Sequence, residues 1–79
     1  MNLQQSTRFI IRTANTSRAH WKDIHNALRG QGLELHRYHA AMLDGGMTIV
    51  ADALHADGAE ELRAREALAA LPVSLYAMH

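Results

Sequence analysis

Hydrophobic and polar residues first alternate along the chain and then change to a helical spacing. The run Thr7–Ala14 is rich in β-branched and aromatic side chains and predicts a strand. From Ser17, which can cap a helix, apolar residues follow at intervals of three and four, and glycines at 30 and 32 end that helix. The strand would present two faces, with Phe9 and Ile11 on one and Arg8, Ile10 and Arg12 on the other.

Two further strands are predicted in the middle of the chain. The run Leu33–Met42 begins with Leu33 and Leu35 in alternation, which puts Glu34, His36 and Tyr38 on the opposite face. Next comes Asp44-Gly45-Gly46, a turn signal, because glycine adopts positive φ without steric cost. The strand Met47–Leu54 after this turn would complete a hairpin.

The last third of the chain predicts a helix and a final strand. Residues 59–71 have high helix propensity, with acidic residues in the first turn and Glu61 placed four residues before Arg65. Leu62 lies off the apolar stripe of this helix. Pro72 ends the helix, and Val73–Met78 alternates as a strand. The stripe consists of Ala64, Ala67, Leu68 and Leu71.

The order β, α, β, β, α, β predicts an α+β fold of the ferredoxin-like kind. Two right-handed crossovers give a four-stranded antiparallel sheet with both helices on one face. The opposite face stays uncovered, and exposed apolar side chains there indicate an interface. We therefore expect Arg8, Ile10 and Arg12 to contact a second copy of the chain or a partner protein, with Val50 and Leu54 on the same face.

Length and composition narrow the class of protein. A chain of 79 residues with 48% apolar residues forms one domain, residues 1–79, in which the polar residues 1–6 would be a flexible leader. A domain this small gains stability from a partner subunit or a parent chain.

Eight basic residues balance eight acidic ones, so no net charge attracts nucleic acid. The absence of cysteine excludes disulfides and thiolate metal sites and favours the cytoplasm, and no apolar run approaches the roughly 20 residues that a membrane span needs.

Candidate catalytic and metal-ligating groups are few. Ser17 and His20 could pair as nucleophile and base, but the sequence shows no orienting carboxylate, and Asp52 and Asp57 lack a paired, buried setting. Phe9 and Tyr76 are too few aromatic residues for an RNA-stacking sheet. The histidines are read as solvated or edge residues, with a site assembled across strands or subunits as the alternative. We expect no metal, no cofactor and no catalysis. The six histidines are His20, His25, His36, His39, His55 and His79.

Three stretches of the chain carry a family resemblance: the run TRFIIRTANTSRAHWKDIHNALRGQGLELHRYHA, the hairpin around LDGGMTIVADA and the helix EELRAREALAALPVSLYAM. Together they resemble an ACT-like domain over nearly the whole chain. Within that group the chain is most similar to the soluble C-terminal domain of MgtC/SapB-family membrane proteins. This resemblance implies a cytosolic domain of an integral membrane protein linked to magnesium limitation and intracellular survival, with a regulatory or protein-contact role. The membrane part would belong to a parent chain outside these residues.

Three hypotheses for function follow. The leading one is a non-catalytic regulatory or interaction domain that forms a homodimer, or binds a partner, through the uncovered sheet face. A second is an ACT-type sensor that holds an amino acid at Asn15, Thr16 and Ser17. A third is a small ferredoxin-like enzyme that uses a histidine in a cleft between helices and sheet.

Overall fold

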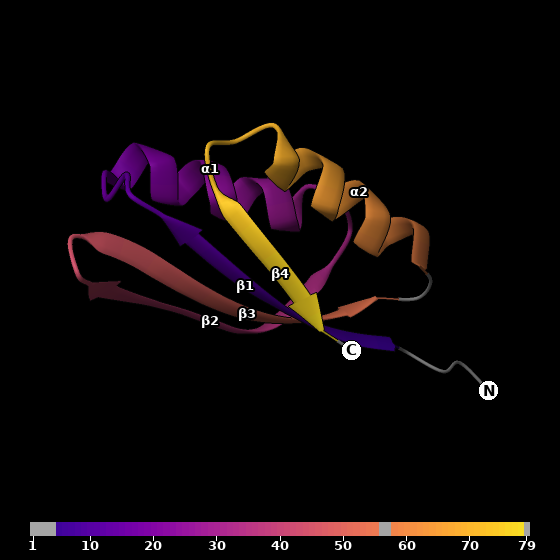
Figure 1. The fold of residues 1–79 in the computed structure, drawn as a ribbon. Coiled ribbons are helices and arrows are strands. Elements are labelled where there is room, and N and C mark those ends of the chain that lie inside the picture. The colour runs from indigo at the N-terminus through magenta and orange to yellow at the C-terminus, as the bar shows by residue number, and fades with distance from the viewer. Residues whose placement is uncertain (1–4, 56–57, 79) are drawn as a thin grey trace.

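The computed structural model describes residues 5–55 and 58–78, which form four strands and two helices (Figure 1). Of the leader expected over residues 1–6, Gln5 and Ser6 belong to the first strand, whereas residues 1–4 lie outside the described residues, as does Asp57. The elements are β1 (Gln5–Thr13), α1 (Arg18–Arg29), β2 (Glu34–Leu43), β3 (Gly46–His55), α2 (Gly58–Ala69) and β4 (Ser74–Met78).

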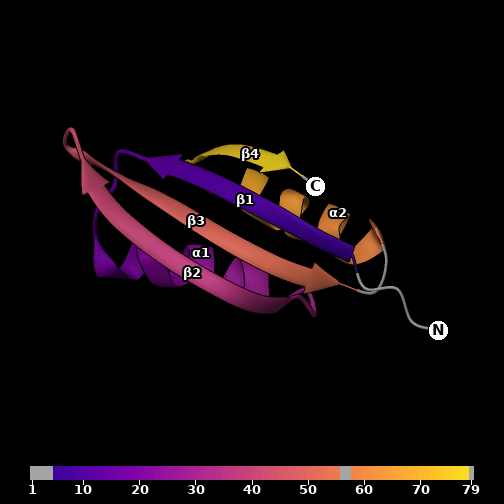
Figure 2. The same cartoon turned by 90° about the horizontal axis from the view of Figure 1, so that it is seen from below.

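The four strands make one antiparallel sheet in the order β2-β3-β1-β4, and both helices lie on the same side of it. Figure 2 looks onto the other side, where the strands are in front and the helices behind. The predicted ferredoxin-like α+β fold is therefore confirmed. Neither helix among the described residues is long and apolar enough to cross a membrane.

The core fills the space between the sheet and the two helices. The alternation predicted for the first strand is confirmed, because Phe9 and Ile11 are fully buried while Arg8 and Arg12 are exposed. Helix α2 contributes Ala64 and Leu68, and Leu62 is 56% exposed, as its position off the stripe predicts. The buried apolar residues are Phe9, Ile11, Ile24, Leu28, Leu33, Met47, Ile49, Ala51, Ala53, Ala64 and Leu68.

Local signals explain where α1 and the hairpin begin and end. Ser17 is the N-cap of α1, and its Oγ accepts a hydrogen bond of 3.2 Å from the backbone N–H of His20. The turn between β2 and β3 has positive φ at Asp44 (51°) and Gly45 (77°), the conformation that a two-residue hairpin turn requires. The predicted cap and the predicted hairpin are both confirmed.

Strand β2 departs from the predicted alternation. Leu35 pairs with Ala53 and Arg37 pairs with Asp52, so the bulge between them leaves His36 as an extra residue. Beyond the bulge Tyr38 pairs with the buried Ala51 and therefore lies on the helix side of the sheet, where it packs against the core. The expectation that Tyr38 faces away from Leu35 was wrong, because the extra residue shifts the alternation by one.

Candidate interaction face

The side of the sheet without helices is the candidate functional site. We call it the open face and define it by the strand residues whose side chains alternate with the buried ones. Its rows run across neighbouring strands, so the register fixes which side chains lie beside one another. The open face consists of Ser6, Arg8, Ile10 and Arg12 of β1, Thr48, Val50, Asp52 and Leu54 of β3, Glu34, Arg37, His39 and Ala41 of β2, and Ser74, Tyr76 and Met78 of β4.

The middle of the open face is apolar. Ile10 pairs with Val50 on one side and with Tyr76 on the other, which places three apolar side chains in one row across β3, β1 and β4. Tyr76 is 63% exposed and Met78, next to it on the same face of β4, is 39% exposed. No element among residues 5–55 and 58–78 covers this row (Figure 2).

A charged row lies beside the apolar one. Arg8 donates from Nε to Oδ1 of Asp52 at 2.7 Å and from its terminal nitrogen to Oδ2 at 3.1 Å, a two-point contact between adjacent strands. These hydrogen bonds lower the pKa of Asp52, and the charges of Arg8, Arg37 and His36 lower it further against the opposing effect of partial burial. Asp52 is therefore the ion-pair partner of Arg8.

All three residues that the sequence predicted for the interface lie on the open face. Arg8 and Arg12 are exposed and Ile10 is half-buried. Sequence reasoning missed the pairing partner Asp52, and it left open which alternating set of the last strand shares this face. A cross-strand register would have revealed both, but single-strand alternation does not fix register.

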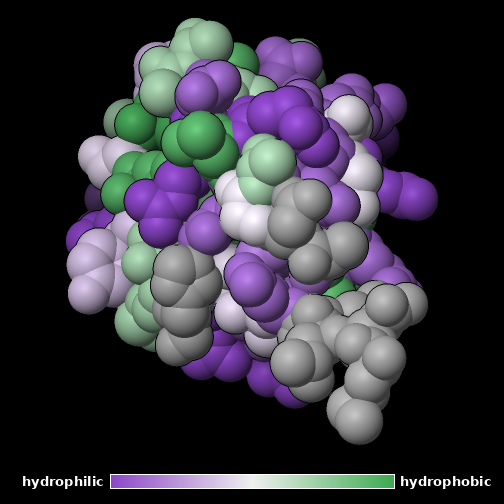
Figure 3. Space-filling view, turned by 90° about the vertical axis from the view of Figure 1, so that its right-hand side faces the viewer, coloured by the Kyte–Doolittle hydropathy of each residue, from purple (hydrophilic) through white to green (hydrophobic). Residues whose placement is uncertain are grey.

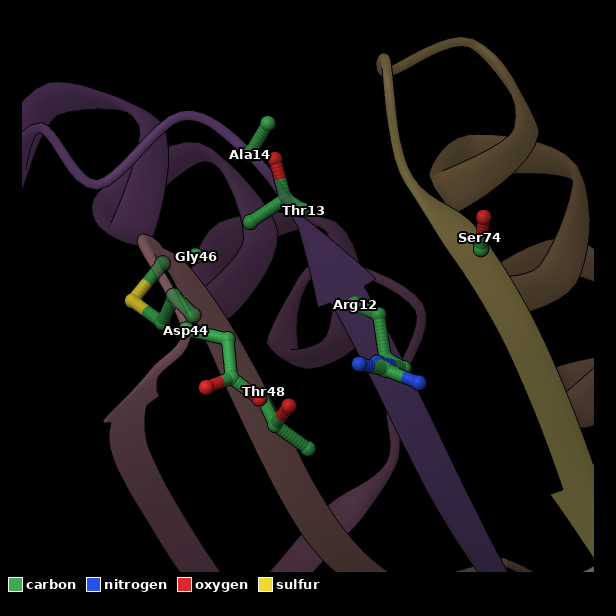
Figure 4. A pocket seen from close by; sticks show the side chains of 8 residues that line it. Arg12, Thr13, Ala14, Asp44, Gly46, Thr48 and Ser74 are labelled. Carbon is green, nitrogen blue, oxygen red and sulfur yellow. The ribbon is translucent and has the colours of Figure 1, made fainter.

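A cavity of about 260 Å³ opens where the open face ends, next to the β2–β3 turn (Figure 4). Arg12 lies between Thr48 on β3 and Ser74 on β4, its direct cross-strand neighbours. Asp44 of the turn lines the same cavity. The guanidinium of Arg12 has no ion pair or hydrogen bond among the described residues, in contrast to that of Arg8.

The loop predicted to bind a ligand uses most of its polar groups within itself. Asn15 Oδ1 accepts from the backbone N–H of Ser17 at 3.0 Å, and Ser17 Oγ caps α1. Thr16 instead lines a separate cavity of about 320 Å³ with Trp21 and Met42. The structure therefore does not gather Asn15, Thr16 and Ser17 around one cavity.

Two histidines read as solvated or edge residues are instead buried. His20 and His55 are 5% and 2% exposed. The Nε2 atom of His20 lies 2.9 Å from the Thr13 hydroxyl, and that of His55 lies 2.7 Å from the Thr7 hydroxyl. The reading was wrong for this pair, because each imidazole has a threonine of β1 as hydrogen-bond partner within the core.

The other described histidines do not form a metal site. His25 stacks on Trp21 with ring centroids 5.5 Å apart and also contacts Tyr38, at 4.7 Å. His25 and His36 line a cavity of about 600 Å³ between α1 and β2, the kind of cleft that the enzymatic alternative requires. Among residues 5–55 and 58–78, no group of three or more histidine, aspartate and glutamate side chains could hold a metal ion.

Apolar side chains also reach the surface away from the open face. The space-filling view of Figure 3 shows apolar surface (green) gathered at the upper left of the view, with polar surface (purple) beside it. Leu62 on the helix layer is nearly as exposed as Tyr76, at 56% against 63%. Exposure of one side chain does not define an interface, and the open face is distinguished by its continuous row.

Comparison with known proteins reveals fold similarity only. No family model and no curated protein matches the chain. Two de novo designed proteins are similar in structure. Ferredog-Diesel has a TM-score of 0.67 and 16% identity, over 95% of this chain and 85% of that one. Foldit4 has a TM-score of 0.69 and 16% identity, over 98% of both chains.

Two natural proteins contain a similar region within a longer chain. An unknown protein from Galdieria sulphuraria has a TM-score of 0.72 and 18% identity, with 95% of this chain covering 44% of that chain. A formyltetrahydrofolate deformylase from Pseudomonas putida KT2440 has a TM-score of 0.71 and 11% identity, with 95% of this chain covering 29% of that chain. At these identities the likeness shows the shared fold.

Proposed function

We propose that this chain is a non-catalytic regulatory or interaction domain that forms a homodimer through its open face. The observation that carries the proposal is the uncovered row formed by Ile10, Val50 and Tyr76, together with Met78. Burying apolar surface contributes about 25 cal/mol per Å², and a domain of this size has little core of its own. Pairing through this row supplies the missing burial.

The charge distribution favours a second copy as the occupant of the open face. Arg37, Asp52 and Arg8 follow one another across β2, β3 and β1, so the face carries both signs of charge. A face with both signs can meet its own copy, because a carboxylate of one copy can lie opposite an arginine of the other. The chain as a whole has a formal net charge of zero, so two copies do not repel each other.

We further propose that the domain is the cytosolic part of a longer membrane protein. The resemblance to the cytosolic C-terminal domain of MgtC/SapB-family proteins supports a regulatory role next to a membrane. The lack of cysteine is in keeping with a reducing compartment such as the cytoplasm. The upstream reading frame tests this part. Transmembrane helices encoded before residue 1 would support it, and a soluble catalytic domain there would contradict it.

Ile10→Asp tests the homodimer. The change places a carboxylate in the centre of the apolar row, and sedimentation equilibrium should show a monomer where the unmodified protein is a dimer at micromolar concentration. Leu62→Asp is the matched control, because it introduces the same charge at an exposed leucine on the helix layer and should leave the dimer intact.

Tyr76→Asp provides a second variant at an exposed position on an edge strand, and circular dichroism checks that each variant is folded. An unmodified protein that stays monomeric at millimolar concentration would sink the proposal. Equal loss of the dimer in Ile10→Asp and Leu62→Asp would also contradict it.

A further inference from the structure

The two arginines that extend from β1 onto the open face differ in their surroundings. Arg8 is neutralised by the two-point contact with Asp52. Arg12, four residues along the same strand, is exposed and has no such partner among the described residues. A guanidinium without a protein partner keeps five N–H donors and a full charge available for a ligand.

The neighbours of Arg12 add donors on both sides. Thr48 and Ser74 are its direct cross-strand partners, so residues with hydroxyl groups lie on both sides of Arg12 in one row of the sheet (Figure 4). Adjacent strands lie about 4.8 Å apart, so the backbones of the three residues are close enough for one small ligand to reach all of them. The cavity of about 260 Å³ beside them has room for a small ligand.

We propose that this end of the open face binds the phosphate group of a small ligand through Arg12, Thr48 and Ser74. A tetrahedral phosphate presents oxygens on several sides and can accept from the guanidinium and from a flanking hydroxyl together. A planar carboxylate satisfies the guanidinium but directs no third oxygen toward a hydroxyl. Phosphate is therefore favoured over carboxylate.

Asp44 opposes the binding of an anion at this site. Its carboxylate lines the same cavity and repels an anion. Binding is then weakened by Asp44 and strengthened by Arg12, so changes at the two positions should act in opposite directions. An anion attracted only by general surface charge would not depend on this pair.

Titration with phenyl phosphate, followed by amide chemical shifts at constant ionic strength, tests the site. Arg12→Gln should weaken binding by about tenfold or more, because it removes the charged donor. Asp44→Asn should tighten binding about threefold, since it removes the repulsion. Arg63→Gln on α2 makes the same charge change as Arg12→Gln, away from the open face, and should alter the affinity by less than about twofold.

Benzoate serves as the carboxylate analogue with the same ring, and inorganic phosphate tests whether the ring contributes. Benzoate binding as tight as that of phenyl phosphate would overturn the assignment to phosphate. Equal losses in Arg12→Gln and Arg63→Gln would overturn the site itself. Because pairing through the open face would cover Arg12, the titration is also made with the monomeric Ile10→Asp variant. This variant should bind phenyl phosphate at least as tightly as the unmodified protein, which separates this inference from the homodimer.

Discussion

At the scale of single residues, buried polar groups distinguish the core of this domain. Thr7 and Thr13 lie near opposite ends of β1, and each hydroxyl has a histidine as partner, His55 and His20 respectively. Burying a hydroxyl or an imidazole without a partner costs about 1–3 kcal/mol, and the hydrogen bond within each pair offsets this cost. The composition of the chain cannot reveal these pairs, because Thr7, the hydrogen-bond partner of His55, lies 48 positions away in the chain.

Tyr38 is the exception, since its hydroxyl is buried with no hydrogen-bond partner among the described residues. Tyr38→Phe removes that hydroxyl and should raise the free energy of unfolding at pH 7 by about 1 kcal/mol. Urea unfolding measures the change. Tyr76→Phe makes the same chemical change at an exposed side chain and should have no such effect. A less stable Tyr38→Phe protein would contradict the expectation.

The alkaline pH dependence of stability follows from the same residue. Burial raises the pKa of Tyr38 to about 12, whereas the unfolded chain has the ordinary tyrosine pKa of about 10. The hydroxyl therefore ionises first in the unfolded state, and stability falls as the pH rises from about 10 to 12. Urea unfolding at pH 9 and pH 11 should show this fall in the unmodified protein and a smaller one in Tyr38→Phe, with Tyr76→Phe unchanged from the unmodified protein.

At the scale of elements, the bulge in β2 decides which side chains reach the core. His36 is the extra residue, and its deletion would join Leu35 directly to Arg37, which continues the alternation that both flanks already have. We expect the deletion of His36 to retain the fold, with a melting temperature within a few degrees of the unmodified protein. Deletion of His39, where the strand is regular, should turn one flank onto the wrong face and unfold the domain. Circular dichroism melts compare the two, and equal unfolding in both would contradict the role of the bulge.

Patterns within one element predicted most of the fold. Alternation in residues 7–14 identified the buried Phe9 and Ile11, and Asp44-Gly45 identified the hairpin turn. The features that were missed depend on pairs of elements. The face of Tyr38 depends on the register of β2 against β3, and the ion pair of Arg8 depends on Asp52 lying opposite it. Register is a property of two strands, so neither strand alone reveals it.

At the scale of the whole molecule, the small core makes each buried side chain costly to lose. Domains of this size have a free energy of unfolding of roughly 4–12 kcal/mol. Leu68 is fully buried on α2, and Leu68→Ala should lower that free energy by about 2–5 kcal/mol. Leu62→Ala removes the same atoms from an exposed position on the same helix and should change it by less than about 0.5 kcal/mol. Urea unfolding tests both variants, and similar losses of unfolding free energy would contradict the division of α2 into a buried face and an exposed face.

The Thr7–His55 pair also limits how β1 can align with β3. A shift of β1 by two residues along β3 would return every apolar side chain to its proper side, so hydrophobicity alone does not forbid it. Such a shift would part Thr7 on β1 from His55 on β3 and remove the hydrogen bond between two buried side chains. This buried pair therefore penalises a misaligned sheet and favours one alignment of β1 with β3 during folding over its nearest competitor.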